Sequence, residues 1–225
     1  MLDKNNFKHI WGITDVIWVF VFRIALVYLF AKFVLPLVPG ISPRLVEILD
    51  RLILISLTLY FVSRKSSIAK LGLHFRDLGR QVVFGVMGGV LLFILAEGSQ
   101  RALVAFLAAD IGTNPLVKAT ADAKRPLDLL WPLFIGGILV PFAEEIYYRG
   151  MALQAFAKRW GWLFGIVISA LFFSFAHLSG IWFVQIAAVG AGLAAIYYIT
   201  GSLLPGIIAH GLVNSARLIM VYLGG

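Results

Sequence analysis

The chain has 225 residues, of which 61% are hydrophobic and 13% are charged. Since a typical globular domain carries about 25% charged residues, this composition excludes an ordinary water-soluble domain and indicates a polytopic membrane protein. No cysteine is present, which excludes disulfides, thiolate metal sites and a cysteine nucleophile. The net charge is +8, but the basic residues collect in loops between apolar runs. That distribution favours the positive-inside rule over nucleic-acid binding.

Apolar runs of spanning length, about 17–25 residues, follow one another along the whole chain. In chain order they lie at 11–35, 46–63, 82–107, 129–156, 161–177, 181–199 and 203–222. The sequence therefore predicts an all-α fold, a polytopic transmembrane helical bundle of about seven spanning helices. We expect a single integral membrane domain over residues 1–225, with a compact helical bundle in its carboxy-terminal half.

Basic residues in the loops predict the orientation of the bundle. With a cytoplasmic amino terminus, the inner loops carry more lysine and arginine than the outer loops. The inner set is Lys4, Lys8, Arg64, Lys65, Lys70, Arg76, Arg80, Lys158 and Arg159, and the outer set is Arg44, Lys118, Lys124 and Arg125. We therefore expect a multi-pass protein of the cell membrane with its amino terminus in the cytoplasm and its carboxy terminus outside.

The stretch "PFAEEIYYRG" places three charged residues inside an apolar run. A charge near the bilayer midplane costs at least about 3 kcal/mol, so these residues are functional candidates. On a helix Glu145 and Arg149 are four residues apart and share a face, which predicts an ion pair. Glu144 is rotated by about 100° from Glu145 and must face elsewhere. Pro141 is expected to kink the helix just ahead of them.

Two later runs each carry a polar cluster of complementary chemistry. Phe173 and His177 share a helical face in the fifth run, and His210 and Asn214 share one in the last run. A carboxylate removed from bulk water can act as general base on a water molecule. Two neutral donors on one face can hold a developing oxyanion. Together with Glu144, these residues form a hydrolytic constellation.

Two further patterns predict contacts within the bundle. Glu97 and Arg101 are four residues apart in the third run and are expected to pair on one face. Gly85 and Gly89 form a small-xxx-small pair in the same run. Such a pair predicts that another helix packs closely against this one.

The three clusters fit the patterns E-E-x-x-x-R ("EEIYYR"), F-x-x-x-H (Phe173 to His177) and H-x-x-x-N (His210 to Asn214) in the right order on successive hydrophobic helices. That ordered triple resembles the CPBP family of intramembrane proteases, also called the CAAX-protease and bacteriocin-processing or Abi family. The family includes the type II CAAX prenyl endopeptidase. The resemblance covers about residues 128–222 and implies that this carboxy-terminal part is the catalytic core. The earlier part of the chain matches only in being helical.

The resemblance implies an endopeptidase that cuts close to the membrane surface, in which four side chains act on the peptide bond and three support them. The catalytic set is Glu144, His177, His210 and Asn214, and the supporting set is Glu145, Arg149 and Phe173. By this resemblance Glu144 activates the hydrolytic water and His177 assists on the same water. His210 and Asn214 then form the oxyanion hole.

The resemblance also favours hydrolysis without a tightly held metal, so no cofactor is expected. The alternative is a catalytic zinc bound by Glu144, His177 and His210, although the H-E-x-x-H pattern of many zinc proteases is absent. The expected partners are the lipid bilayer and a peptide or lipopeptide substrate, either of the prenylated CAAX type or another small membrane-associated peptide. No nucleic acid is expected, and the sequence indicates no oligomeric state.

Two other functions stay open. A proton-coupled transporter could use the same acid and imidazoles as a proton relay. A non-catalytic membrane binding or immunity protein would use them only to hold its helices together.

Overall fold

The computed structural model describes residues 10–38, 40, 42–107, 120 and 123–224. Within these residues every regular element is helical, as the composition predicts. Lys4, Lys8 and Lys118, which contributed to the predicted orientation, lie outside the described residues.

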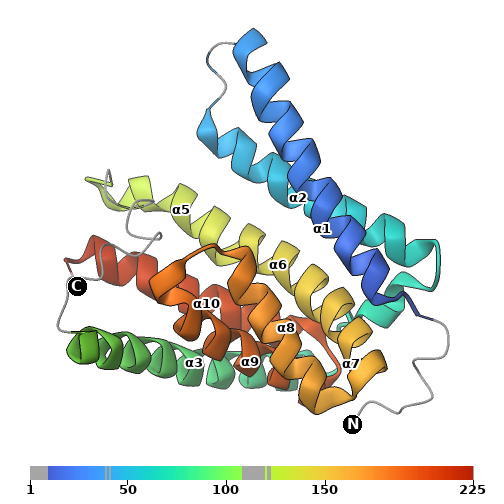
Figure 1. Ribbon diagram of the computed structural model, residues 1–225. Coiled ribbons are helices and arrows are strands. Elements are labelled where there is room, and N and C mark those ends of the chain that lie inside the picture. Colours follow the sequence, from blue (N-terminus) through green and yellow to red (C-terminus); the bar gives the residue numbers. More distant parts are fainter. Residues whose placement is uncertain (1–9, 39, 41, 108–119, 121–122, 225) are drawn as a thin grey trace.

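The chain runs back and forth through a bundle of helices. The amino-terminal part contains α1 (Ile13–Leu29), α2 (Pro43–Ser63) and α3 (Leu78–Leu107). The carboxy-terminal part contains α5 (Leu130–Phe134), α6 (Val140–Glu144), α7 (Gln154–Trp160), α8 (Trp162–Ala176), α9 (Phe183–Thr200) and α10 (Leu203–Tyr222). Figure 1 shows α1 and α2 as a hairpin that leans away from the other helices. α10 packs along α3, and α8 packs along α9.

All seven predicted apolar runs form helix, and five helices of the described chain are long and apolar enough to cross a membrane. These five are Ile13–Leu37, Leu78–Leu103, Pro126–Trp160, Phe183–Thr200 and Leu203–Tyr222. α8 is apolar but shorter. α2 carries several charged residues in its first half, one of which, Asp50, binds Arg23 of α1 at 2.6 Å. The class of a multi-pass helical bundle is therefore confirmed, whereas the number of about seven spans stays a prediction.

The helix over Pro126–Trp160 contains two π-helical segments, Ile135–Leu139 and Glu145–Leu153, which lie on either side of α6. In the first segment the Val140 N–H reaches back to the Ile135 carbonyl. Pro141, which follows, has no N–H to donate. The Gly136 carbonyl is therefore left without a partner in its own helix and can accept a hydrogen bond from a neighbouring one. The sequence predicted a kink at Pro141, and the structure shows an interruption of the helical hydrogen bonding there.

Small residues let α3 and α10 approach closely, as the glycine pair predicts. A Cβ atom on Gly85 would lie 2.7 Å from Ile208, and one on Gly89 would lie 3.1 Å from Ala209. The prediction for Glu97 was wrong, because it pairs with Arg217 of α10 at 2.9 Å rather than with Arg101. The close packing of the two helices brings this partner within reach.

One end of the bundle is tied together by hydrogen bonds between distant segments. The Gln154 side-chain amide donates to the Lys70 carbonyl at 2.8 Å and to the Tyr197 hydroxyl at 2.7 Å. The Leu203 N–H donates to the Gly72 carbonyl at 2.9 Å. The connection between α2 and α3, which contains the short 3₁₀ turn Ile68–Leu71, is thereby fixed against α7, α9 and α10.

Candidate active site

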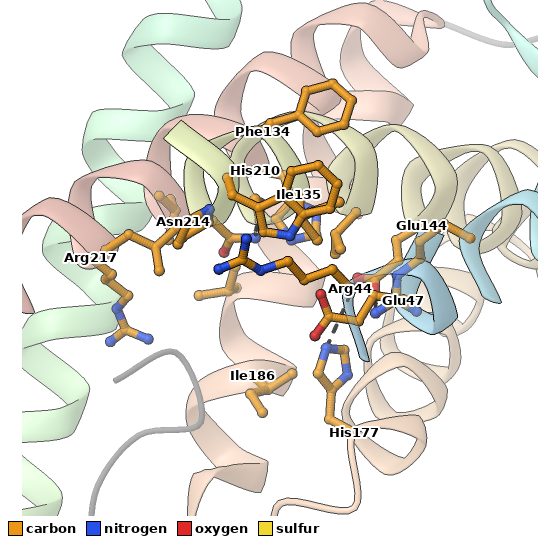
Figure 2. Close-up of a pocket in the computed structure, with 18 of the residues that line it drawn as sticks. Arg44, Glu47, Phe134, Ile135, Glu144, His177, Ile186, His210, Asn214 and Arg217 are labelled. Carbon is orange, nitrogen blue, oxygen red and sulfur yellow. Dashed lines mark hydrogen bonds and ion pairs between the residues drawn. The ribbon is translucent and has the colours of Figure 1, made fainter. Parts of the chain in front are cut away.

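A cavity of about 1220 Å³ lies between α2, the α5–α6 segment, α8, α9 and α10. All four residues of the predicted catalytic set line it, and so does Phe173. Figure 2 shows Glu144 and His177 facing each other on one side of the cavity, with His210 and Asn214 on the other. The fold therefore brings together three clusters that lie far apart in the sequence.

Glu144 and His177 form what we call the cavity pair. Glu144 Oε2 lies 4.0 Å from His177 Nε2 (Figure 2), and the two side chains are 6% and 32% exposed. His177 Nδ1 lies 2.7 Å from the Phe173 carbonyl oxygen of its own helix. Since a carbonyl oxygen only accepts, Nδ1 carries a proton, and Nε2 is left to face the carboxylate.

Glu145, Arg149 and His210 form what we call the buried ionic cluster. Glu145 Oε1 lies 2.9 Å from Arg149 Nη1 and 2.9 Å from His210 Nδ1. Glu145 and Arg149 are both 0% exposed, and His210 is 5% exposed. The ion pair predicted between Glu145 and Arg149 is therefore confirmed. The contact with His210 joins it to α10.

Phe173 lies between the two histidines and above the arginine. Its ring centroid is 4.6 Å from that of His177 and 5.9 Å from that of His210. The Arg149 guanidinium stacks over the same ring at 4.3 Å. Such cation–π contacts stabilise a desolvated cation. Phe173 thus packs against both histidines that line the cavity and against the guanidinium of the buried ionic cluster.

Asn214 is held by the carbonyl that the π-helical segment leaves free. Its side-chain Nδ2 donates to the Gly136 carbonyl at 2.9 Å. An amide group has two N–H donors, so one remains for a ligand in the cavity. Gly211, one turn earlier, allows α10 to approach the π-helical segment this closely, because a Cβ atom there would collide with the Gly137 carbonyl.

Sequence reasoning missed the contribution of α2 to the cavity. Arg44, Glu47 and Arg51 all line it, and Arg51 Nη2 lies 3.8 Å from Glu144 Oε1. Glu144 was expected only to face away from Glu145, and Arg51 is a cationic partner that the sequence did not predict. A signal was present, because charges at i, i+3 and i+7 fall on one face of a helix. Arg44 also lies over the Trp131 ring at 5.7 Å, and Figure 2 shows it reaching across the cavity.

The side chains proposed as zinc ligands do not form a ready metal site. Among the residues that the structure describes, no group of three histidine, aspartate or glutamate side chains is arranged to hold a metal ion. The zinc alternative stays a prediction, and the chemistry below gives no role to a metal.

Comparison with protein families supports the assignment that the motifs suggest. No curated protein and no solved structure matches the chain. Residues 126–216 match the family described as "Type II CAAX prenyl endopeptidase Rce1-like". The matched segment runs from the turn before α5 into α10 and includes the cavity pair, the buried ionic cluster, Phe173 and Asn214. This segment is thus Rce1-like, which confirms the family indicated by the ordered motifs and supports the general function of a protease.

Proposed function

We propose that the protein is an intramembrane endopeptidase in which Glu144 activates a water molecule for attack on a peptide bond. The observation that carries this proposal is the cavity pair, Glu144 Oε2 and His177 Nε2 at 4.0 Å. The family match over residues 126–216 supports it independently.

The spacing of the cavity pair suits a single bridging water. A carboxylate oxygen and an unprotonated imidazole nitrogen are both acceptors, so a donor must lie between them. A water oxygen about 2.8 Å from each of two acceptors 4.0 Å apart makes an angle of roughly 90°, close to the H–O–H angle. Such a water donates one hydrogen to Glu144 and the other to His177. Its lone pairs then point away from both groups, toward a substrate.

The reaction follows from this arrangement. The water oxygen attacks the scissile carbonyl carbon while Glu144 takes one of its protons. The tetrahedral oxyanion that forms is stabilised by donors on the opposite side of the cavity. Glu144 then gives its proton to the leaving nitrogen, and the C–N bond breaks. The products are a carboxylic acid group and an amine, and Glu144 returns to its carboxylate form.

Asn214 and His210 are the proposed oxyanion donors. Asn214 has one N–H left after binding the Gly136 carbonyl. His210 Nδ1 lies 2.9 Å from Glu145, and a carboxylate can only accept, so Nδ1 carries a proton. Nε2 can therefore donate to an oxyanion only when both ring nitrogens are protonated. We assign this imidazolium form to His210 during the reaction, in place of the neutral donor expected from the sequence.

The proposed substrate is a peptide or lipopeptide at the membrane surface, of the prenylated CAAX type or another small membrane-associated kind. The cavity volume of about 1220 Å³ exceeds the roughly 300–1,000 Å³ of most small-molecule sites. It is large enough for a peptide segment. The family match supports this class of substrate.

The test is cleavage of a quenched fluorescent prenylated CAAX lipopeptide by purified protein in detergent. We expect Glu144→Gln to lower the turnover about 10²–10⁴-fold, the usual contribution of a general base, while its thermal unfolding stays close to wild type. Glu47→Gln is the matched control, because it removes another carboxylate that lines the cavity, and it should still cleave.

Each contrary outcome has a distinct meaning. A folded Glu144→Gln protein that cleaves at the wild-type rate contradicts the mechanism. Loss of wild-type cleavage in a strong zinc chelator favours the metal alternative. The transporter and binding-protein alternatives both predict that wild type cleaves no peptide.

A further inference from the structure

Three arginine side chains line the cavity, and two of them are paired with acidic side chains. Arg51 lies 2.6 Å from Asp50, and Arg217 lies 2.9 Å from Glu97. Arg44, the third, forms no ion pair with any residue that the structure describes. Its charge is therefore available to a ligand in the cavity.

The carboxylates that line the cavity do not occupy Arg44. Asp128 binds Arg125 at 3.0 Å, and Glu144 belongs to the cavity pair. Glu47 follows Arg44 by three residues on α2, but the two form no ion pair. Both of these side chains are exposed, so Glu47 leaves the Arg44 guanidinium accessible to a ligand.

The Arg44 side chain is held over the wall of the cavity by an aromatic ring. Its guanidinium lies over the Trp131 ring at 5.7 Å, and Trp131 also lines the cavity. Figure 2 shows Arg44 reaching across the cavity. The N–H donors of a guanidinium lie in its own plane. Stacking on an aromatic face therefore leaves them free to bind a planar carboxylate at two points.

The position of Arg44 on α2 gives its distance from the proposed reaction. Arg51 marks the place of the general base, because its Nη2 lies 3.8 Å from Glu144 Oε1. Arg44 is seven residues earlier, so the two arginines share a face and lie about 10.5 Å apart along the helix axis. An extended peptide advances about 3.3 Å per residue. With the length of the arginine side chain added, Arg44 reaches a group about three to five residues from the scissile bond.

We propose that Arg44 binds a carboxylate of the peptide substrate and so fixes the distance between that group and the bond that is cut. This proposal rests on the proposed function, which places the scissile bond beside Glu144. The carboxyl terminus of the peptide is one source of the carboxylate, and an acidic side chain close to that terminus is the other. Arg44 is thus a substrate-binding residue that selects peptides with an acidic end.

The test uses three quenched lipopeptides of one length and the full-length protein in detergent. The first ends in a free carboxylate and the second in a carboxamide. The third ends in a carboxamide and has glutamate as its last residue. We expect wild type to cleave the second with a kcat/KM about 10–100-fold below that for the first, because a charge-assisted hydrogen bond is lost. The loss should lie in KM, since Arg44 binds the substrate away from the reacting bond.

Arg44→Gln removes the charge and should remove the preference. We expect this variant to cleave the first two peptides equally well, at about the wild-type rate for the carboxamide. Arg44→Lys keeps the charge without the planar fork, and an intermediate preference is expected. It also provides a second variant if Arg44→Gln fails to fold. Lys124→Gln is the matched control, because Lys124 is an exposed cation that does not line the cavity, and it should keep the full preference.

Two results overturn the proposal while the proposed function stands. One is wild type that cleaves the free acid and the carboxamide equally well. The other is a preference that survives in Arg44→Gln or is lost equally in Lys124→Gln. Cleavage of the third peptide at the rate of the first, dependent on Arg44, assigns the carboxylate to a side chain. Cleavage of the third at the slow rate of the second assigns it to the terminus.

A binding measurement separates this proposal from the proposed function. Wild type that cleaves none of the three peptides contradicts the proposed function. Fluorescence anisotropy of the first two peptides with Glu144→Gln protein, with and without Arg44→Gln, then decides the role of Arg44. Tighter binding of the free acid that disappears with Arg44→Gln supports carboxylate recognition, and equal binding of both peptides overturns it.

Discussion

Glu144 and Glu145 are neighbours in the chain, yet they belong to two regions with opposite character. Glu145, in the buried ionic cluster, is 0% exposed and makes two contacts of 2.9 Å. Glu144, in the cavity pair, has its nearest charged partners at 3.8 and 4.0 Å. Consecutive residues on a helix point about 100° apart, so one carboxylate faces the protein interior and the other faces the cavity. The short contacts of Glu145 hold neighbouring helices together, whereas the longer distances around Glu144 leave room for a reactant in the cavity.

Arg149→Met tests the structural side of this comparison and has the largest expected effect. Removing one partner of a buried ion pair typically costs about 3–5 kcal/mol, because the remaining charge is left uncompensated. We therefore expect a large drop in the free energy of unfolding, measured by thermal or chemical unfolding in detergent. Arg159→Met is the matched control, since Arg159 is exposed and a surface change usually stays within about 0.5 kcal/mol. Equal stability of the two variants would contradict a structural role for the buried ionic cluster.

Asn214→Leu tests the cavity side of the comparison, because it removes a proposed hydrogen-bond donor to the oxyanion. Loss of one such donor typically lowers kcat about 10²–10³-fold. Because the contact is made in the transition state, KM should change little. The steady-state kinetics of lipopeptide cleavage check this prediction. A variant with a higher KM and the wild-type kcat would show instead that Asn214 binds the substrate in its ground state.

His177→Asn also tests the cavity side of the comparison, and we expect it to have the smallest effect of the three substitutions. We expect turnover to fall about 100-fold, at the low end for a group that assists proton transfer, because Glu144 remains as the base. The stability should stay close to wild type, since the His177 side chain is 32% exposed. Thermal unfolding and the cleavage rate are measured on the same preparation. A loss of stability as large as that of Arg149→Met would erase the distinction between the two regions.

Features that depend on one helix were predictable from the sequence. The ion pair of Glu145 with Arg149 follows from helical spacing alone, because residues four apart share a face. The same rule placed His210 and Asn214 together on α10, and both line the cavity. The spanning runs appeared as helices for a similar reason, because their composition alone identifies them.

Features that depend on how helices pack were not predictable. The contact of His210 with Glu145 joins residues 65 positions apart. The pairing of Glu97 with Arg217 spans 120 positions and replaced the local partner that helical spacing suggested. Arg51 reaches Glu144 from a helix that the family resemblance does not include. The π-helical segments were not predicted either, because the same apolar run is compatible with an α-helix and with a π-helix.

The hydrogen-bonded connection between α2 and α3 has a consequence for the membrane as a whole. A hydrolase inside a bilayer must admit water, but a continuous water column would also conduct protons and other ions. Gln154, Tyr197 and the 3₁₀ turn close the end of the bundle at which α7 and α9 end and α10 begins. None of the residues that line the cavity comes from that end. The hydrogen-bonded connection therefore closes the bundle on the side away from the cavity, and we expect that water entering the cavity forms no continuous column across the protein.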